Sequence, residues 1–302
     1  MYKINFQKPI HIHFIGIGGI SMSGLAEILL EEGFTVSGSD AKESPLTKKL
    51  ESEGAVIHYG QCAENITDDI NCVVYTAAIN KSNPELMEAV GKKIPMLTRA
   101  ELLGQLMKNY DTPIAVSGTH GKTTTTSMIS EVLLAADMDP TISVGGILKT
   151  IGGNIRVGKS GNFITEACEY TNSFLHFYPK ISVILNIEED HLDFFKDLED
   201  IRHSFHQFSA LLPSDGTLII NGDIKDYQEI YEGLDCNVIT YGSSAEFDYS
   251  ATEIQYDEKG FVSFELLKHN TSCGRVQLSV TGDHNVSNAL AAIATAELLG
   301  IP

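Results

Sequence analysis

At residues 115–126 the chain reads Ala115-Val116-Ser117-Gly118-Thr119-His120-Gly121-Lys122-Thr123-Thr124-Thr125-Thr126. The apolar run that ends at Val116 predicts a strand, and the residues from Lys122 onward predict a helix. Between them, Gly118 and Gly121 let backbone N–H groups converge on an anion, because glycine has no Cβ to block close approach. The helix directs its unpaired N–H groups and the positive end of its dipole to the same place. This order of elements predicts a phosphate-binding turn in an α/β domain.

Two side chains of this turn suit a nucleoside triphosphate. Lys122 can reach the outer phosphates, and the Thr123 hydroxyl can ligate Mg²⁺. The spacing departs from the strict Walker pattern, because Val116 stands where the first glycine belongs. A strand–helix turn with a solvated lysine is the alternative interpretation. The order of strand, turn, Gly-Lys-Thr and helix favours nucleotide binding. The chemistry of imidazole alone assigns no role to His120.

Composition excludes several classes of function. The 302 residues suit two domains, and no apolar run is long enough to span a bilayer. The net charge of −19 argues against nucleic acid or an anionic membrane as partner, because both bind basic surfaces. The five cysteines form no Cys-x-x-Cys pair, which indicates reduced thiols in a cytoplasmic protein rather than a zinc site.

The first part of the chain alternates short apolar runs with helix-like stretches, which predicts a parallel sheet covered by helices. Strands are expected at 11–15, 34–38, 56–59, 73–76 and 94–98, and helices at 20–33, 45–53 and 84–90. The polar segment 108–113 ends in proline and indicates a domain boundary. We therefore expect a Rossmann-like domain over 1–108 and a P-loop domain over 109–302.

The second part continues with buried strands and then changes pattern. Strands are expected at 141–144, 162–166, 182–187, 217–221 and 238–241. The runs 247–256 and 261–267 flank a turn, and 276–280 alternates apolar with polar residues, so the sheet should gain an antiparallel section. The helix after the phosphate turn is expected to carry Met128, Val132, Leu133 and Ala136 on its apolar face. The chain stops just past a last helix, which we interpret as a junction to a further domain.

A second glycine turn, Gly16-Ile17-Gly18-Gly19-Ile20-Ser21, follows the first expected strand. Asp40 follows the next strand, where a ribose-binding acid lies in dinucleotide-binding folds. Ser21 replaces the usual third glycine, and a tight turn without ligand is nearly as good an interpretation. The motif therefore predicts an anion site at a helix N-terminus rather than NAD in particular.

Acidic residues close two of the buried strands in the second part. Glu166 ends the strand at 162–166 and Glu169 lies three residues further on, where a carboxylate beside the phosphate turn can hold Mg²⁺. The run 186–193 contains four acids and His191, whose imidazole can form an ion pair or ligate a metal. Solvated surface loops are the alternative interpretation for most of these acids.

The last helix opens with Asp283-His284-Asn285, and Asn288 lies one turn further on. Asn285 and Asn288 share one helix face, so their amides could read the edge of a base. Capping of the helix by Asp283 is the simpler interpretation.

Taken together, these segments closely resemble the Mur ligases. The matching stretches, in family order, are 13–26, Ser39-Asp40, 117–125, 166–175, 186–193, and His284-Asn285 with Asn288. Many family members have an Asp-Glu-Ser-Asp run after the first glutamate, where this chain has Cys168-Glu169-Tyr170-Thr171. Only Glu166 therefore carries over as a metal ligand from that segment.

The resemblance implies the roles of the site residues. A Rossmann-like domain would bind the UDP-sugar, a central domain would bind ATP with Mg²⁺, and a C-terminal ligase domain would lie outside this chain. Lys122 would contact the outer phosphates, Thr123 and Glu166 would hold one metal, and His191 a second. The remaining expected contacts are Gly16, Gly18, Gly19, Ile20, Ser21 and Asp40 for the UDP-sugar, Gly118, Thr119, His120, Gly121 and Thr124 for ATP phosphates, and His284, Asn285 and Asn288 at the adenine.

The implied reaction joins L-alanine to the lactyl carboxylate of UDP-N-acetylmuramate through an acyl phosphate made from ATP, and a two-domain fragment should turn over little or nothing. A related ligase that attaches a ready-made peptide to the same sugar is the nearest alternative. A P-loop binding module without ligation and an oxidoreductase that uses the first glycine turn are more distant ones. No contact with nucleic acid and no membrane insertion are expected.

Overall fold

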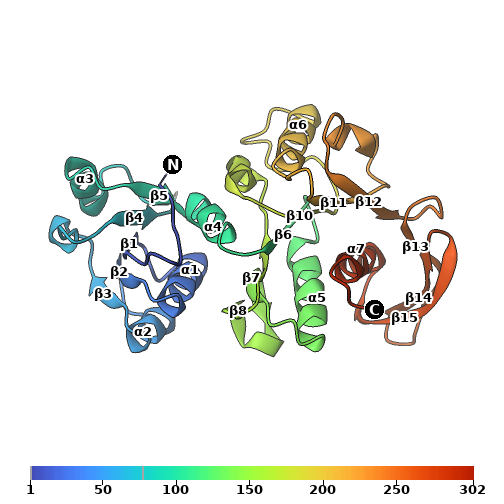
Figure 1. The fold of residues 1–302 in the computed structure, drawn as a ribbon, viewed down its shortest axis with the longest axis horizontal. Coiled ribbons are helices and arrows are strands. Elements are labelled where there is room, and N and C mark those ends of the chain that lie inside the picture. The colour runs from blue at the N-terminus through green and yellow to red at the C-terminus, as the bar shows by residue number, and fades with distance from the viewer. Residues whose placement is uncertain (1, 77) are drawn as a thin grey trace. The chain divides into compact units, whose positions relative to one another are not determined.

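A computed structural model describes residues 2–76 and 78–302 of the chain (Figure 1). Its contacts divide into two compact units, with the division between Asn109 and Tyr110. Within the described residues, no helix combines the length and the hydropathy needed to cross a membrane. The expected α/β architecture, with a parallel sheet in the first unit and a mixed sheet in the second, is confirmed.

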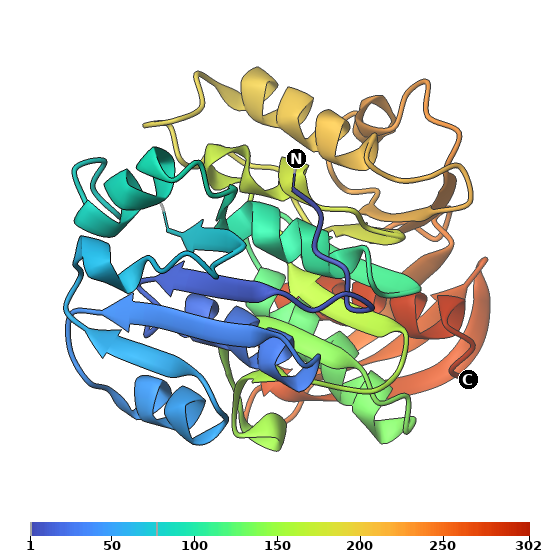
Figure 2. The same cartoon turned by 60° about the vertical axis from the view of Figure 1, so that its left-hand side comes forward.

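The first unit contains a five-stranded sheet in the order β3-β2-β1-β4-β5, with every pairing parallel (the blue to blue-green strands of Figure 2). Its elements are β1 (His11–Ile15), α1 (Ile20–Glu31), β2 (Thr35–Asp40), α2 (Pro45–Ser52), β3 (Val56–Tyr59), β4 (Cys72–Tyr75), α3 (Pro84–Gly91), β5 (Met96–Thr98) and α4 (Arg99–Met107). Strands β2 and β3 lie on one side of β1, and β4 and β5 lie on the other, so the strand order switches between β1 and β4. Ligands of such parallel sheets bind at this switch point, beyond the carboxyl ends of the strands.

Local signals explain where the helices of this unit begin. Ser44 and Thr98 form capping boxes at the starts of α2 and α4, and Asn83 caps α3. Helix α4 was not predicted from the sequence, because Thr98 both ends β5 and caps the next helix, with no loop between them. The apolar side chains of β1 and most of those of α1 are buried, whereas Ile20 at the start of α1 is exposed.

The second unit contains a ten-stranded sheet in the order β15-β14-β13-β12-β11-β10-β6-β9-β7-β8. Its elements are β6 (Thr112–Ser117), α5 (Lys122–Ala135), β7 (Thr141–Leu148), β8 (Gly153–Arg156), β9 (Asn162–Glu166), β10 (Ile181–Ile184), α6 (Leu198–Ser209), β11 (Thr217–Asn221), β12 (Asn237–Gly242), β13 (Tyr249–Tyr256), β14 (Phe261–Lys268), β15 (Thr271–Thr281) and α7 (His284–Leu298). Strand β6 pairs in parallel with both β9 and β10, so the ends of these three strands meet at one edge.

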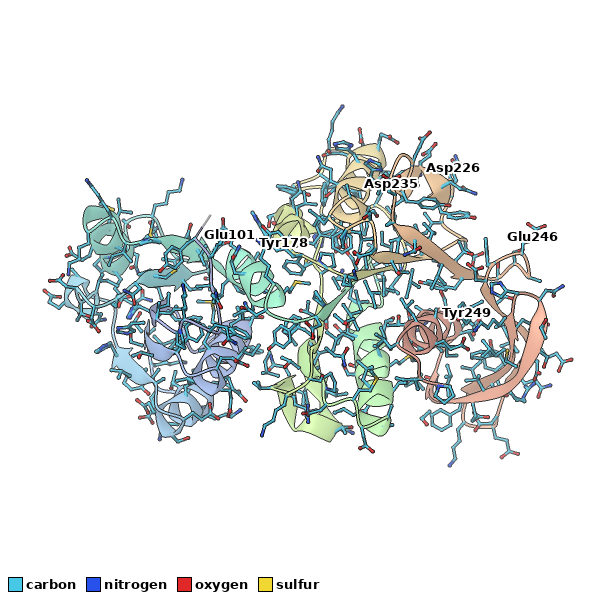
Figure 3. The ribbon with its side chains drawn as sticks, in the orientation of Figure 1. Glu101, Tyr178, Asp226, Asp235, Glu246 and Tyr249 are labelled. Carbon is cyan, nitrogen blue, oxygen red and sulfur yellow. The ribbon has the colours of Figure 1, made fainter. Side chains whose placement is uncertain are left out.

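The expected antiparallel section is confirmed in β13, β14 and β15, which curve around α7 (Figure 1). Tyr249, labelled in Figure 3, donates a 2.9 Å hydrogen bond to Glu297 of α7. Lys268 of β14 pairs with the same carboxylate. Burial, together with Glu297, raises the pKa of Tyr249 to about 12, so its hydroxyl remains a donor at neutral pH.

The face that α5 buries differs from the expected one. Thr125, Ile129 and Leu133 are buried in the core, whereas Met128 and Val132 are only half-buried. Ala136 lies just past the helix end and is exposed. Met128 and Val132 instead line an apolar groove of about 1090 Å³ that α7 and β15 complete. Thr125 and Thr126 are completely buried, so short polar side chains take part of the face that the sequence assigned to larger apolar ones.

Candidate functional site

The phosphate turn leaves the end of β6 and requires glycine at two positions. Gly118 has a φ of 144° and Gly121 a φ of 85°, a region that side chains disfavour. A Cβ on Gly118 would lie 2.9 Å from the Leu185 Cβ, and one on Gly121 would lie 2.8 Å from the Asn288 Oδ1. Helix α5 begins directly after this turn, so its first N–H groups lie beside it.

Asn186, at the start of the loop after β10, fastens the phosphate turn through its side chain. The His120 N–H donates to Asn186 Oδ1 at 2.7 Å, and Asn186 Nδ2 donates to the His120 carbonyl at 3.0 Å. The Thr119 N–H donates to the Asn186 carbonyl at 3.2 Å. The His120 imidazole itself is exposed, with its Nε2 3.8 Å from a Glu188 oxygen. His120 therefore contributes its backbone to the turn.

Lys122 lies with its ammonium group folded over the turn. Its Nζ donates to the carbonyls of Gly118 at 2.5 Å and Thr119 at 3.1 Å. It also contacts both carboxylate oxygens of Glu169, at 3.0 and 3.2 Å. The Glu169 side chain is only 3% exposed, so its charge depends on this lysine for compensation. Glu169 is thus a site residue that the family pattern alone did not supply.

Thr123 and Glu166 form the second pair of the site. The Thr123 hydroxyl donates to Glu166 Oε2 at 3.1 Å, and the Gly145 N–H donates to Glu166 Oε1 at 2.5 Å. A Cβ on Gly145 would lie 2.8 Å from the same carboxylate, so β7 packs closely against it. One hydroxyl and one carboxylate beside a phosphate turn are hard oxygen donors, which fits the preference of Mg²⁺.

Glu169, Asp190 and His191 form a third group, and their ligand atoms lie within 4.8 Å of one another. The His191 Nε2 lies 3.7 Å from Glu169 Oε1. The His191 backbone has a φ of 50°, which is rare for a residue with a side chain. Its N–H donates to Asp190 Oδ1 at 2.7 Å, and its ring packs against Tyr170 with 4.5 Å between centroids. One imidazole and two carboxylates can hold a divalent cation or form an ion-pair network.

The asparagines at the start of α7 bind one another and the end of β15. Asn288 Nδ2 donates to Asn285 Oδ1 at 2.9 Å, and Asn285 Nδ2 donates to the Thr281 carbonyl at 2.7 Å. Both asparagines are buried and their amides bind one another, and their expected place at the adenine stays a prediction. Asp283 stands at the N-cap of α7 as expected, but its side chain makes no capping hydrogen bond, and its carboxylate accepts from the Tyr256 hydroxyl. His284 is exposed.

The glycine turn of the first unit is fastened by β2. The N–H groups of Gly16 and Ile17 donate to the Ser39 carbonyl at 2.9 and 3.0 Å. The Gly18 N–H donates to Asp40 Oδ2 at 2.8 Å, so Asp40 supports the turn directly. Gly19 stands at the N-cap of α1, and Ile20 and Ser21 are exposed in its first turn. This geometry leaves a helix N-terminus exposed at the point where the chain reverses across the sheet.

Replacing Asn186 by alanine is expected to loosen the phosphate turn. The change removes two hydrogen bonds to the His120 backbone, worth about 2 kcal/mol together. We expect ATP to bind about tenfold more weakly, because the turn amides are no longer held in position. Isothermal titration with Mg²⁺ and ATP measures the effect. Asn237→Ala, at the start of β12 and away from this turn, is the matched control, and equal affinity in wild type and Asn186→Ala would contradict the prediction.

Comparison with known protein families assigns both units. Residues 11–111 match the model described as Mur ligase family, catalytic domain. Residues 116–296 match the Mur ligase middle domain. The second match alone covers more than half of the chain.

Curated relatives match along the whole chain. A UDP-N-acetylmuramate–L-alanine ligase of Agathobacter rectalis is 64% identical over 301 residues, covering 100% of this chain and 66% of the relative. A protein of the same name from Lachnospira eligens is 60% identical, with the same coverage. The chain thus spans about 66% of the length of these relatives.

Solved structures agree with this assignment. The UDP-N-acetylmuramate:L-alanyl-γ-D-glutamyl-meso-diaminopimelate ligase of Neisseria meningitidis has a TM-score of 0.85 and 31% identity, covering 97% of this chain and 94% of that one. The UDP-N-acetylmuramate–alanine ligase of Thermotoga maritima has a TM-score of 0.80 and 30% identity, covering 96% of this chain and 65% of that one. Together with the domain matches, these similarities show that the chain belongs to the Mur ligase family.

Proposed function

We propose that this chain supplies the UDP-sugar-binding and ATP-binding parts of a ligase that joins L-alanine to UDP-N-acetylmuramate. The observation that carries the proposal is the phosphate turn with Lys122, beside the Thr123–Glu166 pair and the Glu169–Asp190–His191 group. Relatives at 64% and 60% identity bear the name of this ligase. The energy source would be ATP, as in the Mur ligases generally.

The proposed chemistry forms an amide in two steps. A lactyl carboxylate oxygen of the sugar attacks the γ-phosphorus of ATP, the bond to the β-phosphate oxygen breaks, and ADP leaves an acyl phosphate. The amine of L-alanine then attacks the acyl carbon, loses a proton, and inorganic phosphate departs. In the first step Lys122 would move from Glu169 to the phosphates, where its charge stabilises the transferred group.

Divalent metal has two places in this proposal. Thr123 and Glu166 would hold Mg²⁺, and Glu169, Asp190 and His191 offer the donors for a second ion. The metal would supply the positive charge that neutralises the triphosphate and the carboxylate as they approach each other. In an acidic chain of net charge −19, this local charge is needed to gather anionic substrates.

Binding and turnover experiments test the proposal. We expect the 302-residue chain to bind UDP-N-acetylmuramate in isothermal titration and to release almost no phosphate from ATP, with or without L-alanine. A longer protein that adds the remaining third of the relatives' length should release phosphate only when sugar, ATP and L-alanine are all present. Binding of NAD(H) in place of the UDP-sugar would favour an oxidoreductase. ATP hydrolysis indifferent to both other substrates would favour a nucleotide-binding module.

A ligase that attaches a ready-made peptide to the same sugar is the second candidate. The fold similarity to the Neisseria meningitidis protein, whose name gives a tripeptide as the group joined to UDP-N-acetylmuramate, supports it. The higher identities to alanine ligases favour L-alanine. Assaying the longer protein with L-alanine against a tripeptide separates the two.

The cytoplasm is the location we propose, because five free cysteines suit a reducing compartment.

A further inference from the structure

Tyr170 contacts the loop after β10 at three points. Its ring packs against the His191 ring, with 4.5 Å between centroids and 34° between the ring planes. Its hydroxyl donates to Asp193 Oδ2 at 2.7 Å. The Phe194 ring meets the Tyr170 ring in a T-shaped arrangement, with 6.1 Å between centroids. One side chain therefore holds this loop both by its ring and by its hydroxyl.

Burial in the core does not explain these contacts. Tyr170 is 37% exposed, and its hydroxyl binds a carboxylate at the surface. The hydrophobic anchor of the loop is Phe195, which is only 3% exposed. The His191 carbonyl accepts the N–H groups of Phe194 and Phe195, both at 2.9 Å, so the loop forms a tight turn above this anchor. What Tyr170 adds is contact with the His191 ring.

The segment that carries Tyr170 has a rare backbone conformation. Thr171 and Asn172 follow it with φ values of 54° and 57°, both in the left-handed region. Residues with a side chain seldom adopt this region, and β-branched residues such as threonine do so least. His191, on the other side of the ring contact, has a φ of 50°. Such conformations cost free energy and persist only where surrounding contacts fix them, often at functional sites.

Helix α6 supplies contacts that fix this segment. The Ser204 hydroxyl of α6 donates to Asn172 Oδ1. Phe174 is completely buried and stacks on Phe208 of α6, with 4.6 Å between centroids and 4° between the ring planes. A polar contact and an aromatic stack thus join the segment to the helix. Tyr170 projects from an anchored support, so it can hold a neighbouring side chain in place.

The orientation of the His191 ring decides whether its Nε2 atom faces Glu169. The two atoms Nε2 and Glu169 Oε1 are 3.7 Å apart, which is too long for a hydrogen bond. Donors that lie about 2.1 Å from one ion are about 3–4 Å apart, so this separation suits two ligands of a shared cation. The His191 side chain is 32% exposed, so its own burial does not fix the rotation of the ring. The contact with Tyr170 restricts that rotation.

We propose that Tyr170 is a positioning residue for a divalent cation at the Glu169–Asp190–His191 group. Its ring sets the orientation of the His191 imidazole, and its hydroxyl holds the loop through Asp193. The inference rests on the second metal of the proposed function. Residues that orient metal ligands change metal affinity by about 10–100-fold when they are replaced, which gives the size of the expected effect.

Binding of Co²⁺ to the 302-residue chain tests the proposal, because the visible absorption of this ion reports its coordination by imidazole. The difference between wild type and His191→Ala gives the part of the signal that depends on His191. Tyr170→Phe keeps the ring and loses the contact with Asp193, so we expect about threefold weaker binding. Tyr170→Leu loses the ring as well, and we expect binding at least about tenfold weaker.

Tyr256→Leu is the matched control for these variants. Tyr256 is also exposed, and its hydroxyl also donates to a carboxylate, that of Asp283. The control should bind Co²⁺ with the affinity of the wild type. Wild-type affinity in Tyr170→Leu, with the His191-dependent signal present, would overturn the inference.

A measurement without metal separates this inference from the proposed function. In the ligand-free chain labelled with ¹³C-histidine, the Tyr170 ring should shift the His191 Hε1 resonance upfield. Tyr170→Phe should keep this shift, and Tyr170→Leu should lose it; an unchanged resonance in Tyr170→Leu would contradict the proposed orientation. Equal Co²⁺ binding by wild type and His191→Ala would count against the second metal of the proposed function, and the Hε1 resonance would then decide alone whether Tyr170 orients the ring.

Discussion

Replacing Lys122 by methionine is expected to weaken the binding of Mg²⁺ and ATP by about 100-fold, measured by isothermal titration. The ammonium group is the one cation recorded at the phosphate turn among the described residues, where it lies over the carbonyls of Gly118 and Thr119. A charge-assisted contact with a phosphate is worth about 3 kcal/mol, which corresponds to this loss of affinity. Methionine retains a long, unbranched side chain, so the change removes mainly the charge.

The same substitution leaves Glu169 without its partner, and a double variant separates the two effects. Breaking a buried ion pair costs about 3–5 kcal/mol of unfolding free energy. In Lys122→Met with Glu169→Gln, the uncompensated charge is gone, so most of this stability should return while ATP binding stays weak. Lys149→Met, at an exposed position, is the surface control. Recovery of ATP affinity in the double variant would show that Lys122 acts only through Glu169.

Replacing Gly118 by alanine should cost about 3–5 kcal/mol of unfolding free energy and should abolish ATP binding. A φ of 144° is unfavourable for alanine, and the added Cβ would lie 2.9 Å from the Leu185 Cβ and 3.1 Å from the Asn186 nitrogen. Strain at a special backbone position costs about 1–3 kcal/mol, and overpacking adds about 1–3 kcal/mol. The Asn186 nitrogen belongs to the backbone just after β10, and backbone atoms cannot move aside as the end of a flexible side chain can.

Gly233→Ala is the matched control for this effect. Gly233 lies in the same unit with a φ of 75°, and a Cβ there would meet no atom within 4 Å. The control should lose only about 1 kcal/mol, from the backbone conformation alone. Urea denaturation of the wild type, Gly118→Ala and Gly233→Ala measures the cost of the backbone conformation and the added cost of the close contact. Equal losses in Gly118→Ala and Gly233→Ala would rule out the close contact with Leu185 as the cause.

The sequence predicted the sheets well because their strands are apolar runs that end at glycine or polar residues. The bounds of β1, β9 and β11 agree with the expected ranges. Helix α6 was missed, although its buried residues Ile201, Phe205 and Phe208 have helical spacing. Polar residues between them, including two histidines, obscured the pattern.

The site was predictable only in part, because some of its contacts arise between distant segments. The roles of Lys122 and Thr123 can be predicted from a local sequence motif, and that of Glu166 from its position at the end of a strand. The roles of Asn186 and Glu169 depend on which strands flank β6, and no local pattern contains that information. Asp40 was expected to contact the UDP-sugar, which stays a prediction, and its contact with the Gly18 N–H was not foreseen. A short polar side chain at a strand end suits either role.

The position of β6 between β9 and β10 also has a consequence for the folding kinetics of the second unit. The partners that complete the phosphate turn lie 43, 47 and 66 residues further along the chain, at Glu166, Glu169 and Asn186. Contacts of such sequence separation form late, because the loops that close them carry a large entropic cost. The turn can therefore assemble only after three strands have joined. ATP binding would then report the joining of these three strands, and chains in which they have not joined would not compete for the nucleotide.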